Sequence, residues 1–135
     1  MPVLKILSVD DDKDDQFMLK KIFKTLVPSA EIVQAYNGVE CIAYLEANAG
    51  LLPSLITMDL NMPLVNGIEA TATLKQDERF RHIPVVILTT SDRGNDKVMT
   101  MNKGADDFFT KPVIYNELQL TIKTIVDKWL GKLLR

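Results

Sequence analysis

Five short runs rich in apolar residues alternate with five longer stretches in which apolar residues recur three and four positions apart. The short runs are Val3–Val9, Glu31–Ala35, Leu55–Met58, Val85–Thr89 and Phe108–Thr110. Runs of this length are typical of strands, and the longer spacing is typical of helices with one buried face. Strands that alternate with helices predict βαβ units, and therefore a mostly parallel sheet with helices on both faces.

The expected helices are marked by their apolar residues. These are Met18, Leu19, Ile22, Phe23 and Leu26; Val39, Ile42, Ala43 and Leu45; the segment Ile68–Leu74; Val98 and Met101; and Leu118, Ile122, Ile125, Val126, Trp129 and Leu130. Turn-forming residues separate them, so Pro28 is expected to close the first helix and Asn37-Gly38 to open the second. The more polar run Glu31–Ala35 predicts an edge strand, because central parallel strands are buried on both faces.

The length and charge of the chain narrow its class. Its 135 residues fit one domain, and 47% hydrophobic residues can fill a core. A net charge of −2 disfavours autonomous nucleic-acid binding, which needs a basic field. No apolar run approaches the roughly 20 residues that cross a bilayer, so we expect a cytoplasmic protein without a membrane partner. The single cysteine, Cys41, cannot form an intrachain disulfide and is expected in the core.

Polar residues stand where four of the predicted strands end. Asp10-Asp11-Asp12 follows the first strand, Asp59 follows the third, Thr89-Thr90-Ser91 ends the fourth, and Lys111-Pro112 follows the fifth. Sheets of this kind bind ligands at the carboxyl ends of their strands. The sequence therefore predicts that carboxylates, a hydroxyl and an ammonium converge on one edge of the sheet. Clustered carboxylates repel one another unless a cation compensates for their charge.

Oxygen ligands favour a hard cation, and Mg²⁺ typically binds one or two carboxylates together with a phosphate oxygen. A carboxylate beside such an ion can accept a phosphoryl group as an aspartyl phosphate. Lys111 and Thr89 are suited to neutralise and position the phosphoryl oxygens. By contrast, Asp12, Asp14 and Asp15 are expected to supply favourable charge at a helix start. His82 is expected in a solvated loop.

Several short segments occur in the order and spacing of a known family. They are Val9-Asp10-Asp11, Met58-Asp59-Leu60-Asn61-Met62-Pro63, Asn66-Gly67, Leu88-Thr89, Gly104-Ala105 and Thr110-Lys111-Pro112. With them, the chain from roughly Leu4 to Leu130 resembles the receiver domain of two-component response regulators, and it is similar to the chemotaxis regulator. The resemblance implies an α/β fold: a doubly wound, five-stranded parallel sheet of strand order 2-1-3-4-5, flavodoxin-like. It also implies a single-domain regulator over residues 1–135, without an output domain.

The resemblance implies roles for individual acidic and amide residues. Asp59 would be the phosphoacceptor and a metal ligand. Asp11 would bind Mg²⁺ directly, Asp10 would bind it through water, and the backbone carbonyl of Asn61 would be the third protein ligand. Asn61 also matches a variable position that tunes the lifetime of the phosphate.

The resemblance further implies a switch. Thr89 would hydrogen-bond a phosphoryl oxygen and move towards it, Lys111 would pair with the phosphoryl group, and Phe108 would turn inward. Phe108 has no hydroxyl, so such a switch would work by packing alone. Thr90 stands where many receivers carry alanine or glycine, which implies tighter access to the phosphate. Ser91 matches a second position that tunes the phosphate lifetime.

The resemblance also implies partners. A sensor histidine kinase would donate the phosphoryl group, and a histidine phosphotransfer protein or a downstream target would receive the signal. Arg79–Pro84 and Leu88–Asp92 resemble regulators paired with phytochrome-like kinases. Receivers commonly dimerise through the fourth helix, fifth strand and fifth helix. The apolar end of the last helix, with Trp129 and Leu133, either caps the fold or forms an interface.

Three other functions fit the residues of this chain less well. A phosphatase of the haloacid dehalogenase type needs Asp-x-Asp on an early strand, whereas Asp59-Leu60-Asn61 follows the third. A carrier of flavin mononucleotide needs a Ser/Thr/Gly-rich loop after the first strand, where this chain is rich in aspartate. A pseudo-receiver would act by binding alone and would never be phosphorylated, although the chain has all the site residues of the family.

Overall fold

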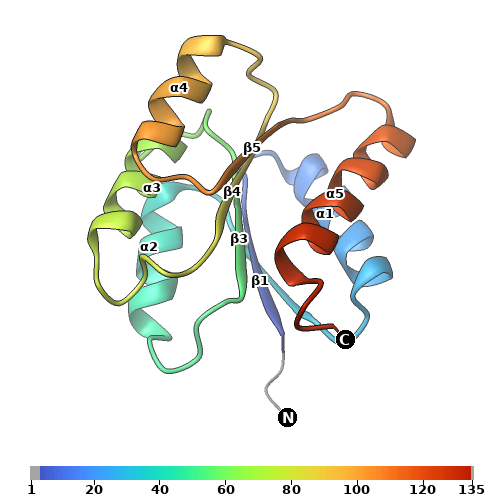
Figure 1. The fold of residues 1–135 in the computed structure, drawn as a ribbon, viewed down its shortest axis with the longest axis horizontal. Helices are drawn as coiled ribbons and strands as arrows, with labels where there is room; N and C mark the ends of the chain where they lie inside the picture. Colours follow the sequence, from blue (N-terminus) through green and yellow to red (C-terminus); the bar gives the residue numbers. More distant parts are fainter. Residues whose placement is uncertain (1–3, 135) are drawn as a thin grey trace.

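The computed structural model describes residues 4–134 as a sheet between two layers of helices (Figure 1). The elements are β1 (Lys5–Val9), α1 (Lys13–Leu26), β2 (Glu31–Ala35), α2 (Gly38–Ala47), β3 (Leu55–Met58), α3 (Gly67–Gln76), β4 (Val85–Thr89), α4 (Gly94–Asn102), β5 (Asp107–Thr110) and α5 (Tyr115–Leu130). All neighbouring strands are parallel, in the order β2-β1-β3-β4-β5. The predicted fold class and strand order are therefore confirmed.

The sheet separates two hydrophobic clusters. Helices α1 and α5 cover one face, and α2, α3 and α4 cover the other (Figure 1). The central strands β1, β3 and β4 are almost entirely buried, whereas β2 is largely half-buried. This difference confirms the predicted edge position of Glu31–Ala35, because an edge strand has a neighbour on one side only. Cys41 is fully buried on the inner side of α2, as predicted, and burial raises the pKa of its thiol to about 12.

Element boundaries agree with the sequence to within two residues. The sequence predicts the first strand over Val3–Val9, whereas β1 begins at Lys5. Val3 lies outside the described residues. The last run gains Asp107 at its start. Helix α1 ends at Leu26, just before Pro28, and Asn37 caps α2 by accepting a hydrogen bond from the backbone N–H of Glu40 at 2.8 Å.

The buried face of α4 differs from the prediction. Val98 and Met101 were expected on the apolar face of this helix, but both are exposed, and the buried residue is Thr100. Val39 in α2 is likewise exposed. Helix α4 is short and packs against α3 and β5 near the sheet edge. A narrow strip of the helix is therefore covered, and the hydroxyl of Thr100 is accommodated there because it donates to the carbonyl oxygen of Asp96.

The end of α5 answers a question that the sequence left open. Trp129 packs against the hydrophobic cluster under α1 and α5, and its Nε1 donates to Asp107 Oδ2 at 3.1 Å. Trp129 therefore helps to cap the fold. Leu133, by contrast, is 59% exposed. Within residues 4–134, none of the helices is long and apolar enough to cross a membrane.

Gly67 sets the distance between α3 and the segment that follows β3. Its backbone N–H donates to Leu60 O at 3.0 Å, and Asn66 caps the helix through the N–H of Glu69 at 2.9 Å. A β-carbon at Gly67 would overlap the carbonyl oxygen of Asp59 and lie 2.8 Å from Leu60 Cα. The absence of a side chain therefore allows the helix to pack directly behind Asp59.

We expect Gly67→Ala to lower the free energy of unfolding by about 1–3 kcal/mol, because the added methyl group must displace backbone. Gly94→Ala is the matched control, since a β-carbon there meets nothing within 4 Å. Urea denaturation of the two variants and the wild type measures the difference. Equal stabilities of the two variants would contradict this role of Gly67.

Candidate functional site

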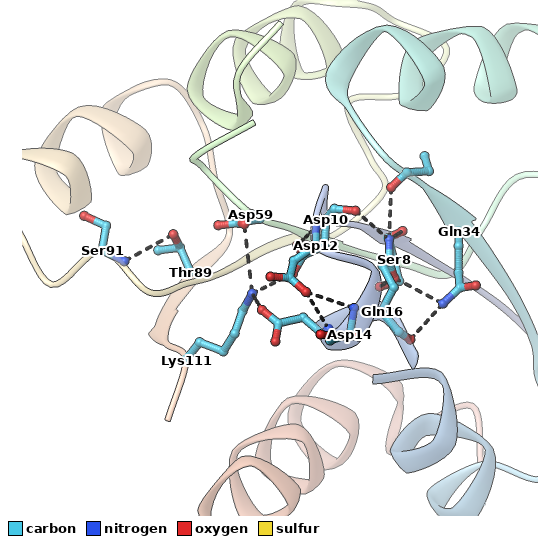
Figure 2. Close-up of polar contacts among 12 residues, drawn as sticks. Ser8, Asp10, Asp12, Asp14, Gln16, Gln34, Asp59, Thr89, Ser91 and Lys111 are labelled. Atoms are coloured by element: carbon cyan, nitrogen blue, oxygen red, sulfur yellow. Dashed lines mark hydrogen bonds and ion pairs between the residues drawn. The ribbon is translucent and has the colours of Figure 1, made fainter. Parts of the chain in front are cut away.

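Side chains from four strand ends meet at one edge of the sheet. Asp10 follows β1, Asp59 follows β3, Thr89 ends β4, and Lys111 follows β5. Lys111 Nζ lies 2.6 Å from Asp10 Oδ2 and 3.9 Å from Asp59 Oδ2. Figure 2 shows the ammonium group beside these carboxylates, with Thr89 on the far side of Asp59 from the loop after β1. The predicted convergence of acidic, hydroxyl and ammonium groups is therefore present.

The carboxylates form a compact oxygen cluster. Asp10, Asp11 and Asp59 each offer an oxygen, and these atoms lie within 4.8 Å of one another. Asp10 and Asp59 are buried, whereas Asp11 is exposed. Asp59 Oδ1 is buried and has no hydrogen-bond partner within the described part of the chain. Because buried polar atoms normally have partners, this oxygen is available to a group from outside the chain.

The donor set of this cluster suits a hard divalent cation. All its side-chain donors are carboxylate oxygens, the type of ligand that Mg²⁺, Ca²⁺ and Mn²⁺ prefer. Asn61, two residues after Asp59, is exposed beside the cluster. Asp59 Oδ1 gives the cluster one oxygen that accepts no hydrogen bond from residues 4–134. The residues present therefore fit a divalent metal ion.

The charge of Asp10 is poorly stabilised. Burial raises the pKa of Asp10 to about 6, and the like charge of Asp59 acts in the same direction. The hydrogen bond from Lys111 and the N–H of Asp12, 2.9 Å from Asp10 Oδ1, offset only part of this effect. Added positive charge nearby would therefore favour the ionised form of Asp10.

In the same environment, the charged form of Lys111 is favoured, whereas that of Asp10 is disfavoured. Burial alone would lower its pKa, but hydrogen bonds to Asp10 and Asp15 and the charges of Asp10 and Asp59 outweigh burial and raise the pKa above its ordinary value. Lys111 is therefore a protonated ammonium. The two shifts are compatible because Lys111 has three acidic neighbours, whereas Asp10 has another carboxylate beside it.

The prediction for Asp15 was incomplete. Asp12 accepts hydrogen bonds from the N–H groups of Asp14 and Asp15 at 2.9 and 3.0 Å, so the acidic run does begin α1 as predicted. However, Asp15 Oδ2 also lies 2.8 Å from Lys111 Nζ. The contact joins residues 96 positions apart. Its only sequence signal was an acid in the first turn of the helix that starts at the site.

Sequence reasoning missed Gln16, which holds the loop after β1. The side chain is buried, and its Nε2 lies 3.0 Å from the carbonyl oxygens of Ser8, Asp10 and Ala35. Its Oε1 accepts from Ser8 Oγ at 2.8 Å and from Gln34 Nε2 at 3.2 Å (Figure 2). The network joins β1, α1 and β2, and thereby fixes the backbone that carries Asp10. A polar residue on the buried side of a helix was the available signal.

A polar cavity of about 290 Å³ opens on the β4 side of the site. It is lined by Asn61, Thr90, Ser91, Asp92, Arg93 and Asp96. The backbone N–H of Ser91 donates to Thr89 Oγ1 at 3.3 Å, and the Ser91 hydroxyl donates to the Asp96 carboxylate at the start of α4. Three residues whose roles were implied by resemblance, Asn61, Thr90 and Ser91, therefore share one cavity wall.

The remaining predicted residues lie apart from this cluster. Phe108 is half-buried in β5 and packs against the hydrophobic cluster under α2, α3 and α4. Its N–H is bonded to its neighbour Asp107 at 3.0 Å. His82 is exposed in the segment before β4, as predicted. The structure thus places Phe108 beside Ile87 of β4, on the neighbouring edge strand.

Comparison with known proteins agrees with this fold. Residues 6–123 match the sequence model of the response regulator receiver domain family. Protein PilH of Pseudomonas aeruginosa is 34% identical over 122 residues, which cover 90% of this chain and 97% of PilH. Response regulator Rcp1 of Synechocystis sp. is 30% identical over 133 residues, which cover 96% of this chain and 90% of Rcp1. The chain is a member of the response regulator receiver domain family of two-component signalling.

Solved structures show the same similarity in three dimensions. A phosphorylated cyanobacterial phytochrome response regulator, RcpA, superposes with a TM-score of 0.89 at 32% identity and covers 96% of this chain and 95% of its own. The Mn²⁺-bound form of Rcp1 superposes with a TM-score of 0.85 at 30% identity, with 94% of each chain covered. A receiver domain is a signalling switch, and the acidic pocket of this one is consistent with a divalent metal.

We expect Asp10→Asn to stabilise the metal-free protein in a pH-dependent way. The pKa of Asp10 is raised in the folded state, so the protonated acid stabilises the fold at low pH, and this stabilisation is lost as the pH rises through about 6. Asparagine lacks the buried charge, so the variant should gain about 1–3 kcal/mol of unfolding free energy at alkaline pH and little below about pH 4. Urea denaturation across pH in the presence of a chelator measures this gain. A difference that does not change with pH would refute the assignment.

Proposed function

We propose that the protein is a phosphorylatable switch in which Asp59 accepts a phosphoryl group from a sensor histidine kinase. The observation that carries this proposal is the buried Asp59 Oδ1, which has no hydrogen-bond partner among the described residues and lies in a cluster of acids beside Lys111. A carboxylate oxygen without a protein partner is free to act as a nucleophile, while the nearby ammonium can balance the charge that the phosphoryl group adds.

The proposed transfer needs little covalent help from the protein. An oxygen of Asp59 forms a bond to phosphorus as the phosphorus–nitrogen bond of the donor phosphohistidine breaks, and the histidine leaves as neutral imidazole because its other ring nitrogen carries a proton. The protein contributes position and charge neutralisation. Lys111 is proposed to pair with a phosphoryl oxygen. Asp59 is held for this reaction by its backbone N–H, which donates to Val9 O at 2.9 Å.

We propose Mg²⁺ as the required cation. Asp10, Asp11, Asp59 and the backbone carbonyl of Asn61 would hold it, with Asp10 acting through water. A bound Mg²⁺ would supply positive charge against the carboxylates and the phosphoryl oxygens. The oxygen-only cluster supports this choice, as does the Mn²⁺-bound form of the relative Rcp1.

Thr89 and Phe108 are proposed to carry the signal away from Asp59. Thr89 Oγ1 already accepts a hydrogen bond from Ser91 N–H, so its own O–H is available to donate to a phosphoryl oxygen. Movement of Thr89 would alter the packing around β5, the neighbouring strand that carries Phe108. Such coupling biases a two-state equilibrium at a distant face. Asn61, Thr90 and Ser91 are proposed to set the phosphate lifetime, because they line the cavity beside the acceptor.

The output is proposed to be protein–protein contact. A downstream target or a histidine phosphotransfer protein would bind the switched face, and the donor kinase is proposed to be of the phytochrome-associated type. This type is supported by the likeness to RcpA, whose structure is that of a phytochrome response regulator. A homodimer would use the face of α4, β5 and α5, where Val98, Met99 and Leu120 are exposed. Leu133 extends the exposed apolar surface at the chain's end.

Acetyl phosphate tests the proposed acceptor. We expect one phosphoryl adduct on the intact protein when Mg²⁺ is present, and at least a tenfold loss of adduct in Asp59→Asn or in a chelator, because nucleophile and charge neutralisation are both required. Asp92→Asn is the matched control, since this carboxylate is exposed on the cavity wall and outside the acidic cluster. Intact-protein mass spectrometry measures the adduct.

An adduct that persists in Asp59→Asn would move the acceptor to another residue. No adduct from either acetyl phosphate or a histidine kinase, together with no Mg²⁺ binding, would support the pseudo-receiver instead. In that case the exposed apolar surface would become the main functional feature of the protein.

A further inference from the structure

Lys111 contacts a carboxylate that lies outside the acidic cluster, in addition to two that belong to it. An ammonium has three N–H donors. Two of them are within hydrogen-bond distance of Asp10 Oδ2 at 2.6 Å and Asp15 Oδ2 at 2.8 Å, whereas Asp59 Oδ2 is 3.9 Å away. Asp15 is not part of the acidic cluster that could hold a cation. Lys111 is therefore anchored by one carboxylate that belongs to the cluster and by one that does not.

Asp15 is well placed to keep this contact. Its backbone N–H donates to the Asp12 side chain at 3.0 Å, which fixes the first turn of α1. Its side chain is 25% exposed, and that of Lys111 is 5% exposed, so water screens the pair only in part. The contact links the start of α1 to the segment after β5. It therefore holds Lys111 at the site independently of Asp10.

We infer that Asp15 is a positioning residue: by sharing the ammonium of Lys111, it leaves Asp10 freer to bind the divalent cation while Lys111 stays beside Asp59. This inference rests on the proposed function, because it concerns the Mg²⁺ of that site. Asp15 touches neither the cation nor the phosphoryl group in this arrangement. Its effect passes through Lys111.

Two electrostatic effects of Asp15 act in the same direction. Without the Asp15 charge, the ammonium would be balanced by Asp10 and Asp59 alone, and both are members of the acidic cluster. Lys111 would then compete more strongly with a cation for these oxygens. The local negative charge would also fall by one, which lowers the attraction for any cation. Loss of the Asp15 charge should therefore weaken Mg²⁺ binding.

Asp14 allows this role to be separated from ordinary helix-start charge. Asp14 and Asp15 lie in the same turn, and both backbone N–H groups donate to Asp12 Oδ1, at 2.9 and 3.0 Å. Asp14 is exposed, and within residues 4–134 it forms no ion pair with Lys111. Asp14→Asn and Asp15→Asn therefore remove the same charge from neighbouring positions, and only the second removes the contact with Lys111.

Isothermal titration calorimetry with Mg²⁺ tests the inference on the full chain. We expect Asp15→Asn to weaken Mg²⁺ affinity about threefold to tenfold, and Asp14→Asn to weaken it by less than about twofold. Asp15→Glu keeps the charge and should retain most of the affinity. In a Lys111→Met background, Asp15→Asn should have no larger effect than Asp14→Asn, because the shared ammonium is gone. Circular dichroism confirms that each variant is folded.

Equal effects of Asp15→Asn and Asp14→Asn would overturn the inference, as would an Asp15→Asn effect that is unchanged in the Lys111→Met background. Either result would leave the proposed function intact, because the wild type would still bind Mg²⁺. Absence of Mg²⁺ binding by the wild type would overturn the proposed cation and this inference together. The wild-type titration therefore distinguishes the two failures.

Discussion

The buried ion pair between Asp10 and Lys111 is the interaction on which the site depends. Parallel strands direct their carboxyl ends to one edge of the sheet. The acids that follow β1 and β3 are therefore brought together although their like charges repel. Lys111, which follows β5, supplies the compensating charge 2.6 Å from Asp10. Loss of Lys111 would leave buried carboxylates without a compensating charge, which is strongly destabilising. The pair therefore joins the segment after β1 to the segment after β5 at the acidic cluster that we propose to bind the cation.

The compensation is incomplete. One ammonium is shared among Asp10, Asp15 and Asp59, and the raised pKa of Asp10 shows that its charge remains costly. Asp59 Oδ1 is buried without a hydrogen-bond partner among residues 4–134. A neutral residue in place of Asp10 should stabilise the metal-free fold, so the buried negative charge fits the proposed binding of a cation. A bound cation and a phosphoryl group would change the net charge at the site, as the proposed switch requires.

Several features followed directly from residue patterns. Period and length identified the strands and helices, and polarity identified Glu31–Ala35 as an edge strand, because burial on both faces requires continuous apolar sequence. The pattern failed for α4, where Val98 and Met101 are exposed, since apolar spacing shows which residues share a helix face but not how much of that face a neighbour covers. It also missed Gln16, whose burial depends on three carbonyl oxygens from β1, the loop after it and β2.

The sequence by itself determined the order of the elements, the parallel sheet and the residues at each strand end, because these depend on local periodicity and on chain direction. Its motifs also identified the receiver family. Only the tertiary structure decided that Asp15 contacts Lys111, that Trp129 caps the fold and that Gly67 packs behind Asp59. Each of these contacts joins segments whose spacing depends on how helices pack on the sheet. Helix packing is set by the fit of many side chains at once, and no single motif records that fit.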